Sequence, residues 1–122
     1  MRKILLLSAL LFSSIMYSQT TVSNGDWSNT GTWDNNQLPA TTDNVVIAHS
    51  IDIDNSRTVA NLTINSGARL DVDGALTVTG TVTNNGELRV RNADMTHSGT
   101  TFNNNKEIFI SAGMDLILSN AS

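Results

Sequence analysis

The chain has 122 residues, with one proline and no cysteine; 39% of its residues are hydrophobic and 5% are aromatic. This composition suits a single small domain, and the lack of cysteine excludes disulfide bonds and a cysteine-linked lipid anchor. The formal net charge of −4 argues against nucleic acids and anionic lipid surfaces as partners.

Residues 1–18 have the features of a secretory signal peptide. Arg2 and Lys3 precede a run of apolar and small residues that extends to position 16, and Ser18 provides a small residue for cleavage. The run is short for a membrane span, and no second apolar stretch follows it. We therefore expect export to the cell surface or the extracellular space. Without Arg2 and Lys3, five basic residues remain against eleven acidic ones, a net charge of −6.

Residues 19–44 are predicted to form an N-terminal cap. The segment is rich in Asn, Gly, Ser and Thr, and it contains both tryptophans, Trp27 and Trp33. The first coil of a solenoid has an exposed apolar end, so we expect the two indole rings to fold over it. The alternative is a flat platform on which sugar rings stack, and this makes Trp27 and Trp33 candidate ligand-binding residues.

Residues 45–122 alternate short apolar triplets with turn residues, and the pattern repeats. Residues 81–90 align with residues 101–110 at an offset of twenty without a gap, and residues 61–72 join this alignment if two residues are added at their turn. Self-similarity at 17 to 21 residues is typical of a solenoid. The aligned pairs Asn84-Asn85 and Asn104-Asn105 are predicted to stack as a hydrogen-bonded ladder.

We therefore predict an all-β fold, a right-handed, three-sided parallel β-helix of about four coils. Stacking pairs the backbone groups of strands that are too short for stable hairpins. A β-sandwich is the alternative, since short strands separated by turns also suit that class. The predicted inward residues form an aliphatic column: Val45, Ile47, Ile51, Ile53, Leu62, Ile64, Leu70, Val72, Leu76, Val78, Leu88, Val90, Ile108 and Ile110.

The last triplet, residues 116–118, is followed by only a few polar residues. This leaves the predicted fourth coil without a cap and its strand edges open. We expect this end to be covered either by further coils of a longer protein or by another copy of the chain.

Charged residues mark the second strand of each predicted coil. Two outward columns result, which contain Asp52, Asp71 and Arg89, and Asp54, Asp73 and Arg91. Opposite side chains on neighbouring strands lie about 5 Å apart. We therefore predict a solvated charge ladder with ion pairs between Asp71 and Arg89 and between Asp73 and Arg91.

A calcium site is the alternative interpretation of the same carboxylates. Like charges directly opposite one another repel unless a hard cation lies between them, so Asp52, Asp54, Asp71 and Asp73 are candidate calcium ligands. The arginines neutralise half of the cluster, and no calcium-loop spacing is present. Both observations favour the charge ladder, and we expect no other cofactor.

Paired carboxylates also suggest hydrolysis of glycosides. The facing arginines are expected to lower the pKa of these carboxyl groups rather than keep one protonated as a general acid. We therefore predict no catalytic residues and no enzyme activity. His49 and His97 are predicted to be isolated surface residues, and neither a nucleophile elbow nor a phosphate-binding loop is present.

The N-terminal motif resembles a known type of secreted module. Gly25-Asp-Trp27, Gly31-Thr-Trp33, Pro39 and the strands at residues 43–47 and 51–54 are similar to the start of the domain family named for its eight glycines, and to segments of large bacterial adhesin-like surface proteins. The resemblance covers residue 21 to about residue 91. It implies an extracellular module for adhesion or carbohydrate contact, usually followed by more coils and a sorting domain.

The leading functional prediction is a secreted, non-catalytic β-solenoid module that contacts a surface polysaccharide, a glycan or a neighbouring protein. The alternative is the N-terminal part of a polysaccharide lyase or glycoside hydrolase whose catalytic coils lie beyond Ser122. A third hypothesis is end-to-end self-association through the fourth coil. We expect no nucleic-acid partner and no membrane span after signal cleavage.

Overall fold

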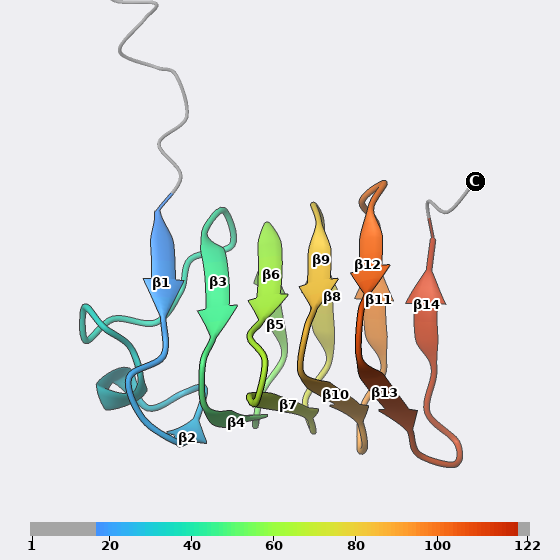
Figure 1. Cartoon of the computed structure of the whole chain (residues 1–122), viewed down its shortest axis with the longest axis horizontal. Coiled ribbons are helices and arrows are strands. Elements are labelled where there is room, and N and C mark those ends of the chain that lie inside the picture. Colours follow the sequence, from blue (N-terminus) through green and yellow to red (C-terminus); the bar gives the residue numbers. More distant parts are fainter. Residues whose placement is uncertain (1–16, 120–122) are drawn as a thin grey trace, which may run out of the picture.

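The computed structural model describes residues 17–119, in which three sheets of short parallel strands form a solenoid (Figure 1). Sheet 1 contains, in spatial order, β1 (Ser18–Thr20), β3 (Asn44–Ile47), β6 (Asn61–Ile64), β9 (Val82–Asn84) and β12 (Phe102–Asn104). Sheet 2 contains β2 (Gly25–Asp26), β4 (Ser50–Ile53), β7 (Arg69–Val72), β10 (Glu87–Val90) and β13 (Glu107–Ile110). Sheet 3 contains β5 (Arg57–Val59), β8 (Leu76–Val78), β11 (Met95–His97) and β14 (Leu116–Leu118).

Each strand in the interior of a sheet pairs with the strand one coil before it and the strand one coil after it. Leu62 in β6, for example, lies opposite Val45 in β3 and Val82 in β9. Every predicted triplet overlaps one strand from β3 to β14. The predicted all-β parallel solenoid of about four coils is confirmed, and the sandwich alternative is wrong because all the paired strands of the three sheets are parallel.

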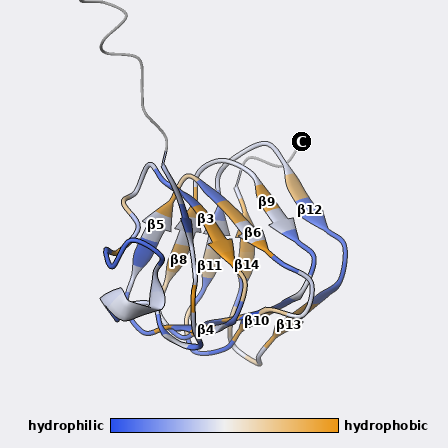
Figure 2. Ribbon diagram, turned by 60° about the vertical axis from the view of Figure 1, so that its left-hand side comes forward, coloured by the Kyte–Doolittle hydropathy of each residue, from blue (hydrophilic) through white to orange (hydrophobic). Residues whose placement is uncertain are grey.

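The core is the column of inward side chains between the three sheets. Hydrophobic residues lie on strands such as β3 and β6, whereas much of the connecting chain is hydrophilic (Figure 2). The predicted inward residues from Val45 to Val90 are at most 1% exposed, and burying each one contributes about 1.5–3 kcal/mol. Ile108 and Ile110 lie in register with the inward Leu88 and Val90, as predicted, but Ile108 is only partly buried and Ile110 is 48% exposed. Both lie on β13, the last strand of its sheet.

The predicted cap segment contains two strands that the sequence did not predict. β1 pairs with β3, and β2 pairs with β4. Their inward positions are polar or glycine rather than apolar: Gln19 is buried, and its Nε2 donates to Asp43 Oδ2 at 3.2 Å. Of the predicted signal peptide, residues 1–16 lie outside the described residues, whereas Ser18 already belongs to β1.

The two tryptophans belong to the buried core cluster. Their rings pack edge to face, with centroids 4.8 Å apart and planes at 70°, and Trp33 Nε1 donates to the carbonyl oxygen of Trp27 at 2.9 Å. An edge-to-face pair of this kind contributes about 0.5–1.5 kcal/mol beyond its area burial. That Trp27 and Trp33 cap the solenoid stays a prediction.

The predicted asparagine ladder is present at the corner between sheets 1 and 2. Asn84 Nδ2 donates to Asn104 Oδ1 at 2.8 Å, and Asn105 Nδ2 donates to Asn85 Oδ1 at the same distance. Asn84 is fully buried and also donates to the carbonyl oxygen of Glu107, while its Oδ1 accepts from the Gly86 amide. Because both the Nδ2 and the Oδ1 of this buried amide have hydrogen-bond partners, Asn84 links two successive coils.

Candidate functional site

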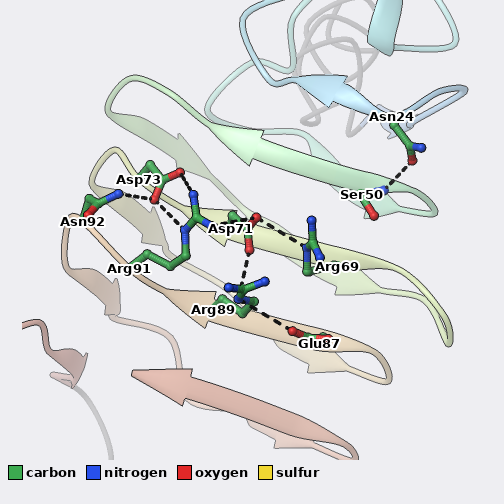
Figure 3. A network of polar contacts seen from close by, with 9 residues as sticks. All are labelled: Asn24, Ser50, Arg69, Asp71, Asp73, Glu87, Arg89, Arg91 and Asn92. Carbon is green, nitrogen blue, oxygen red and sulfur yellow. Dashed lines mark hydrogen bonds and ion pairs between the residues drawn. The ribbon is translucent and has the colours of Figure 1, made fainter. Parts of the chain in front are cut away.

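The candidate site is the outer surface of sheet 2, where charged side chains from four successive coils lie in register. Figure 3 shows the charged side chains of the two middle coils, on and just after β7 and β10. Inward aliphatic residues alternate with these side chains along each strand, as a pleated strand requires. We call this surface the charged face. It consists of Ser50, Asp52, Asp54, Arg69, Asp71, Asp73, Glu87, Arg89, Arg91, Glu107, Phe109 and Ser111.

Asp71 is the centre of the charged face and is only 5% exposed. Arg69 Nε lies 3.4 Å from its Oδ2, Arg89 Nε lies 3.5 Å from its Oδ1, and Arg91 Nη1 lies 3.6 Å from its Oδ2. The predicted pair of Asp71 and Arg89 is therefore part of a larger cluster. Three guanidinium groups compensate for the removal of this carboxylate from water.

Asp73 and Arg91 form the shortest pair on the face. Arg91 Nε donates to Asp73 Oδ1 at 3.0 Å, and Arg91 Nη2 donates to Oδ2 at 2.6 Å; Asn92 Nδ2 also donates to Oδ1 at 2.7 Å. A two-pronged guanidinium–carboxylate contact fixes both groups in orientation. Chiefly through the hydrogen bonds from Arg91, the pKa of Asp73 falls to about 2, and the same contact raises the pKa of Arg91.

Asp52 behaves in the opposite way. A hydrogen bond with Asp73, followed by burial and by the charge of Asp73, raises the pKa of the Asp52 carboxyl to about 6. Its Oδ1 is buried and accepts no hydrogen bond from the described residues. The expectation that the arginines lower the pKa of these carboxyl groups is correct for Asp73 and wrong for Asp52, because Arg91 is already engaged by Asp73.

The four candidate calcium ligands do not converge on one point. The Asp54 carboxylate accepts a hydrogen bond from Ser28 Oγ, which lowers the pKa of Asp54. Asp71 and Asp73 face arginines instead of a gap between carboxylates. Within residues 17–119 no group of three or more histidine or acidic side chains is arranged to hold a metal ion. The geometry favours the charge ladder over the calcium interpretation.

Trp27 and Trp33 present no accessible ring face for a sugar, because they are 0% and 1% exposed. His97 is also buried, so its prediction as a surface residue was wrong: its Nε2 lies 2.6 Å from the carbonyl oxygen of Gly80, and its ring packs edge to face on Phe102. His49 Nδ1 lies 2.9 Å from Thr21 Oγ1. The two histidines contact different partners, and neither lies on the charged face.

A shallow hollow of about 310 Å³ opens on the charged face. Glu87, Arg89, Arg91, Phe109 and Ser111 line it. Phe109 is half exposed and lies directly opposite Arg89 on the neighbouring strand. A second hollow of about 230 Å³ lies at the start of the same strands, between Arg69, Glu87 and Glu107.

Sequence reasoning did not single out Phe109 as a site residue. The signal was present in the strand Glu-Ile-Phe-Ile, whose alternation turns the aromatic residue outward between two inward isoleucines. An aromatic ring beside two arginines, a carboxylate and a hydroxyl group combines an apolar surface with several hydrogen-bonding groups.

No protein-family model, curated protein or solved structure matches this chain. Among the described residues, no helix has the length and apolar character needed to cross a membrane.

Proposed function

We propose that the protein is a secreted, non-catalytic β-solenoid module that contacts a surface polysaccharide or glycan through the charged face. The observation that carries the proposal is the hollow between Phe109, Arg89 and Arg91. Secretion is inferred from the basic and apolar N-terminal sequence. The adhesin-like resemblance of the segment around Trp27 and Trp33 points in the same direction.

The chemistry of the hollow suits a sugar ring. The apolar C–H face of a pyranose can lie on the exposed ring of Phe109, since aromatic side chains supply rigid apolar contact area. Arg89 and Arg91 offer several N–H donors to ring and hydroxyl oxygens, and Glu87 and Ser111 offer acceptors. These polar groups surround the aromatic ring, as in other small-molecule sites.

Charge favours a neutral polysaccharide over an anionic one. Carboxylates outnumber guanidinium groups on the charged face, and Asp71 and Asp73 already engage the arginines. An acidic glycan would have to compete with these ion pairs and meet the overall negative charge of the chain. The parallel strands of sheet 2 are stacked along the solenoid axis. Several sugar units of one polymer could therefore contact the same face.

Binding of neutral cello-, manno- and xylo-oligosaccharides, with oligogalacturonate as the acidic comparison, tests the proposal. We expect Phe109→Ala to weaken binding of the neutral ligand about two- to tenfold, the equivalent of one aromatic contact of about 0.5–1.5 kcal/mol. Ile117→Ala is the matched control, because Ile117 is similarly exposed but lies on β14 in sheet 3. An equal loss of affinity for the oligosaccharide in both variants would contradict the proposal, and so would an affinity that Phe109→Ala does not change.

One observation bears on the alternative of a glycan-degrading enzyme. The pKa values of Asp52 and Asp73, about 6 and about 2, are separated as in an acid–base pair. The raised pKa of Asp52, however, comes chiefly from hydrogen bonding with Asp73 and from its charge, which indicates direct contact, whereas glycosidases hold their two carboxyl groups about 5–9.5 Å apart around the sugar and water. This contact supports the non-catalytic assignment. Release of reducing ends from a bound polysaccharide that Asp52→Asn abolishes would favour the enzyme instead.

A further inference from the structure

The last coil among the described residues presents an open cross-section. The edge strands there are β12, β13 and β14, one from each sheet and all from the same coil. We call their outer edges and inward side chains the open end. The three strands carry most of the exposed large hydrophobic residues of the described chain: Phe109, Ile110, Ile117 and Leu118 are 41–50% exposed. Of these, Ile110 and Leu118 point inward and belong to the open end.

The inward side chains of the open end are uncharged. Phe102, Ile108 and Leu116 are only partly buried against the core, while Ile110 and Leu118 stack on the buried Val90 and His97. A second layer stacked on them would bury apolar surface without removing a charge from water, which matches the composition of stable interface centres. It would also pair the free backbone groups of three edge strands.

The opposite end of the solenoid does not match this cross-section. The sheets end there at β1, β2 and β5, which belong to two different coils. Residues 28–42 also extend beyond β1 at that end (Figure 1). In a head-to-tail stack of two copies, three edge strands of one coil would meet edge strands that belong to two different coils. This mismatch disfavours a repeating filament.

A two-fold arrangement, in contrast, matches the open end with itself. A two-fold axis through the middle of sheet 2 places β13 antiparallel to β13 of the second copy, and it places β12 against β14. β13 has four residues, and β12 and β14 have three each, so every edge strand meets a strand of its own length. We propose that two copies of this chain associate tail to tail through the open end.

The register follows from the alternation of β13. Inward residues must lie opposite inward residues, so the axis passes beside Ile108 or Phe109. An axis at Ile108 would set Lys106 opposite the inward Ile110 and bury a charge without a partner. An axis at Phe109 sets Ile108 opposite Ile110 and Glu107 opposite Ser111, which keeps like charges apart. The two Phe109 rings then lie side by side on the outer surface.

The absence of native cysteine makes the register directly testable. Directly opposite residues of antiparallel strands have Cα atoms about 4.5–5.5 Å apart, which is within the range for a disulfide bond. We expect Phe109→Cys in the purified full chain to form a disulfide-linked dimer on mild oxidation. Val22→Cys, at the other end of the molecule, is not expected to form a disulfide-linked dimer under the same conditions, because Val22 is exposed but lies beyond β1, at the opposite end of the sheets from the open end.

Sedimentation equilibrium of the unmodified chain supplies the second measurement. We expect a monomer–dimer equilibrium in the micromolar range that Ile110→Asp shifts to the monomer at least tenfold, whereas Val22→Asp does not. Circular dichroism melts of both variants establish that the solenoid is folded, so that a loss of dimer is not a loss of fold. A folded chain that stays monomeric at all concentrations, a filament of larger mass, or cross-linking at Val22 would each overturn the proposal.

The dimer does not rest on the proposed function. Ile110 points inward and does not line the hollow, so Ile110→Asp tests association without changing the groups that would meet a sugar. Arg89→Ala removes a donor from the hollow but leaves the inward column intact. Arg89→Ala is expected to weaken only sugar binding, and Ile110→Asp only the dimer. Failure of one proposal can therefore be distinguished from failure of the other.

Discussion

At the scale of single residues, Asp52 and Asp73 have pKa values displaced in opposite directions, which makes the stability of the solenoid depend on pH. The pKa of Asp73 is about 2 in the folded chain, below its ordinary value of 3.8. Its contribution is therefore complete above pH 4 and is lost as the pH falls towards 2. The pKa of Asp52 is about 6, so its contribution is complete below pH 4 and is lost as the pH rises through 6.

We therefore predict that the melting temperature is highest near pH 4, declines towards pH 6 and then levels off. Asp52→Asn removes the titrating group while retaining a similar shape, so the decline between pH 4 and pH 6 should largely disappear. The measurement is a series of thermal melts across this pH range for the native chain and the variant. A decline of the same size in both chains would show that another group causes it.

At the scale of the strand, the buried asparagine of the ladder provides the second prediction. Asn84→Ala leaves the carbonyl oxygen of Glu107 and the amide of Gly86 without their side-chain partner. Leaving a buried polar group unsatisfied costs about 1–3 kcal/mol, so we expect the free energy of unfolding to fall by about 2–4 kcal/mol in urea titrations.

Asn103→Ala is the matched control, because Asn103 is exposed on the same strand as Asn104. Its substitution should change the free energy of unfolding by no more than about 0.5 kcal/mol. If both substitutions have the same effect, the corner is stabilised by the turn itself and not by the ladder.

The strands of the regular coils could be predicted because the alternation of apolar residues and the sequence repeat indicate the same strands. Residues 116–118 were predicted as a triplet, and they form a strand with the same bounds. Alternation identified the inward side chains, and the repeat identified which strands lie side by side. The ion pair of Asp73 and Arg91 followed from register alone.

The remaining features depend on contacts that periodicity does not encode. β1 and β2 carry the polar Gln19 and the flexible Gly25 at inward positions, so they lack the alternation of a strand. The raised pKa of Asp52 depends on whether Arg91 pairs with Asp52 or with Asp73, and side-chain conformation decides this. Phe109 could not be identified as a site residue from the sequence, because the hollow exists only where two neighbouring strands display Phe109 and the arginines together.

At the scale of the whole molecule, the interior of the first coils depends on the tryptophan pair. Trp33 is fully buried against Trp27 and donates to its carbonyl oxygen. Trp33→Ala should lower the free energy of unfolding by about 3–5 kcal/mol, the usual cost of removing a large buried aromatic side chain. The measurement is urea unfolding followed by circular dichroism, with the exposed Val22→Ala as the control. A loss below about 1 kcal/mol would argue against the cap.

The charged face as a glycan-contact surface is the central claim, and an NMR titration tests it most directly. The isotope-labelled chain is titrated with the neutral oligosaccharide that binds best, and the amide shifts are mapped onto the three sheets. The proposal predicts changes concentrated at Arg89, Arg91, Phe109 and Ser111 in sheet 2. Changes centred on sheet 1 or sheet 3, or no changes with any of the oligosaccharides, would contradict it.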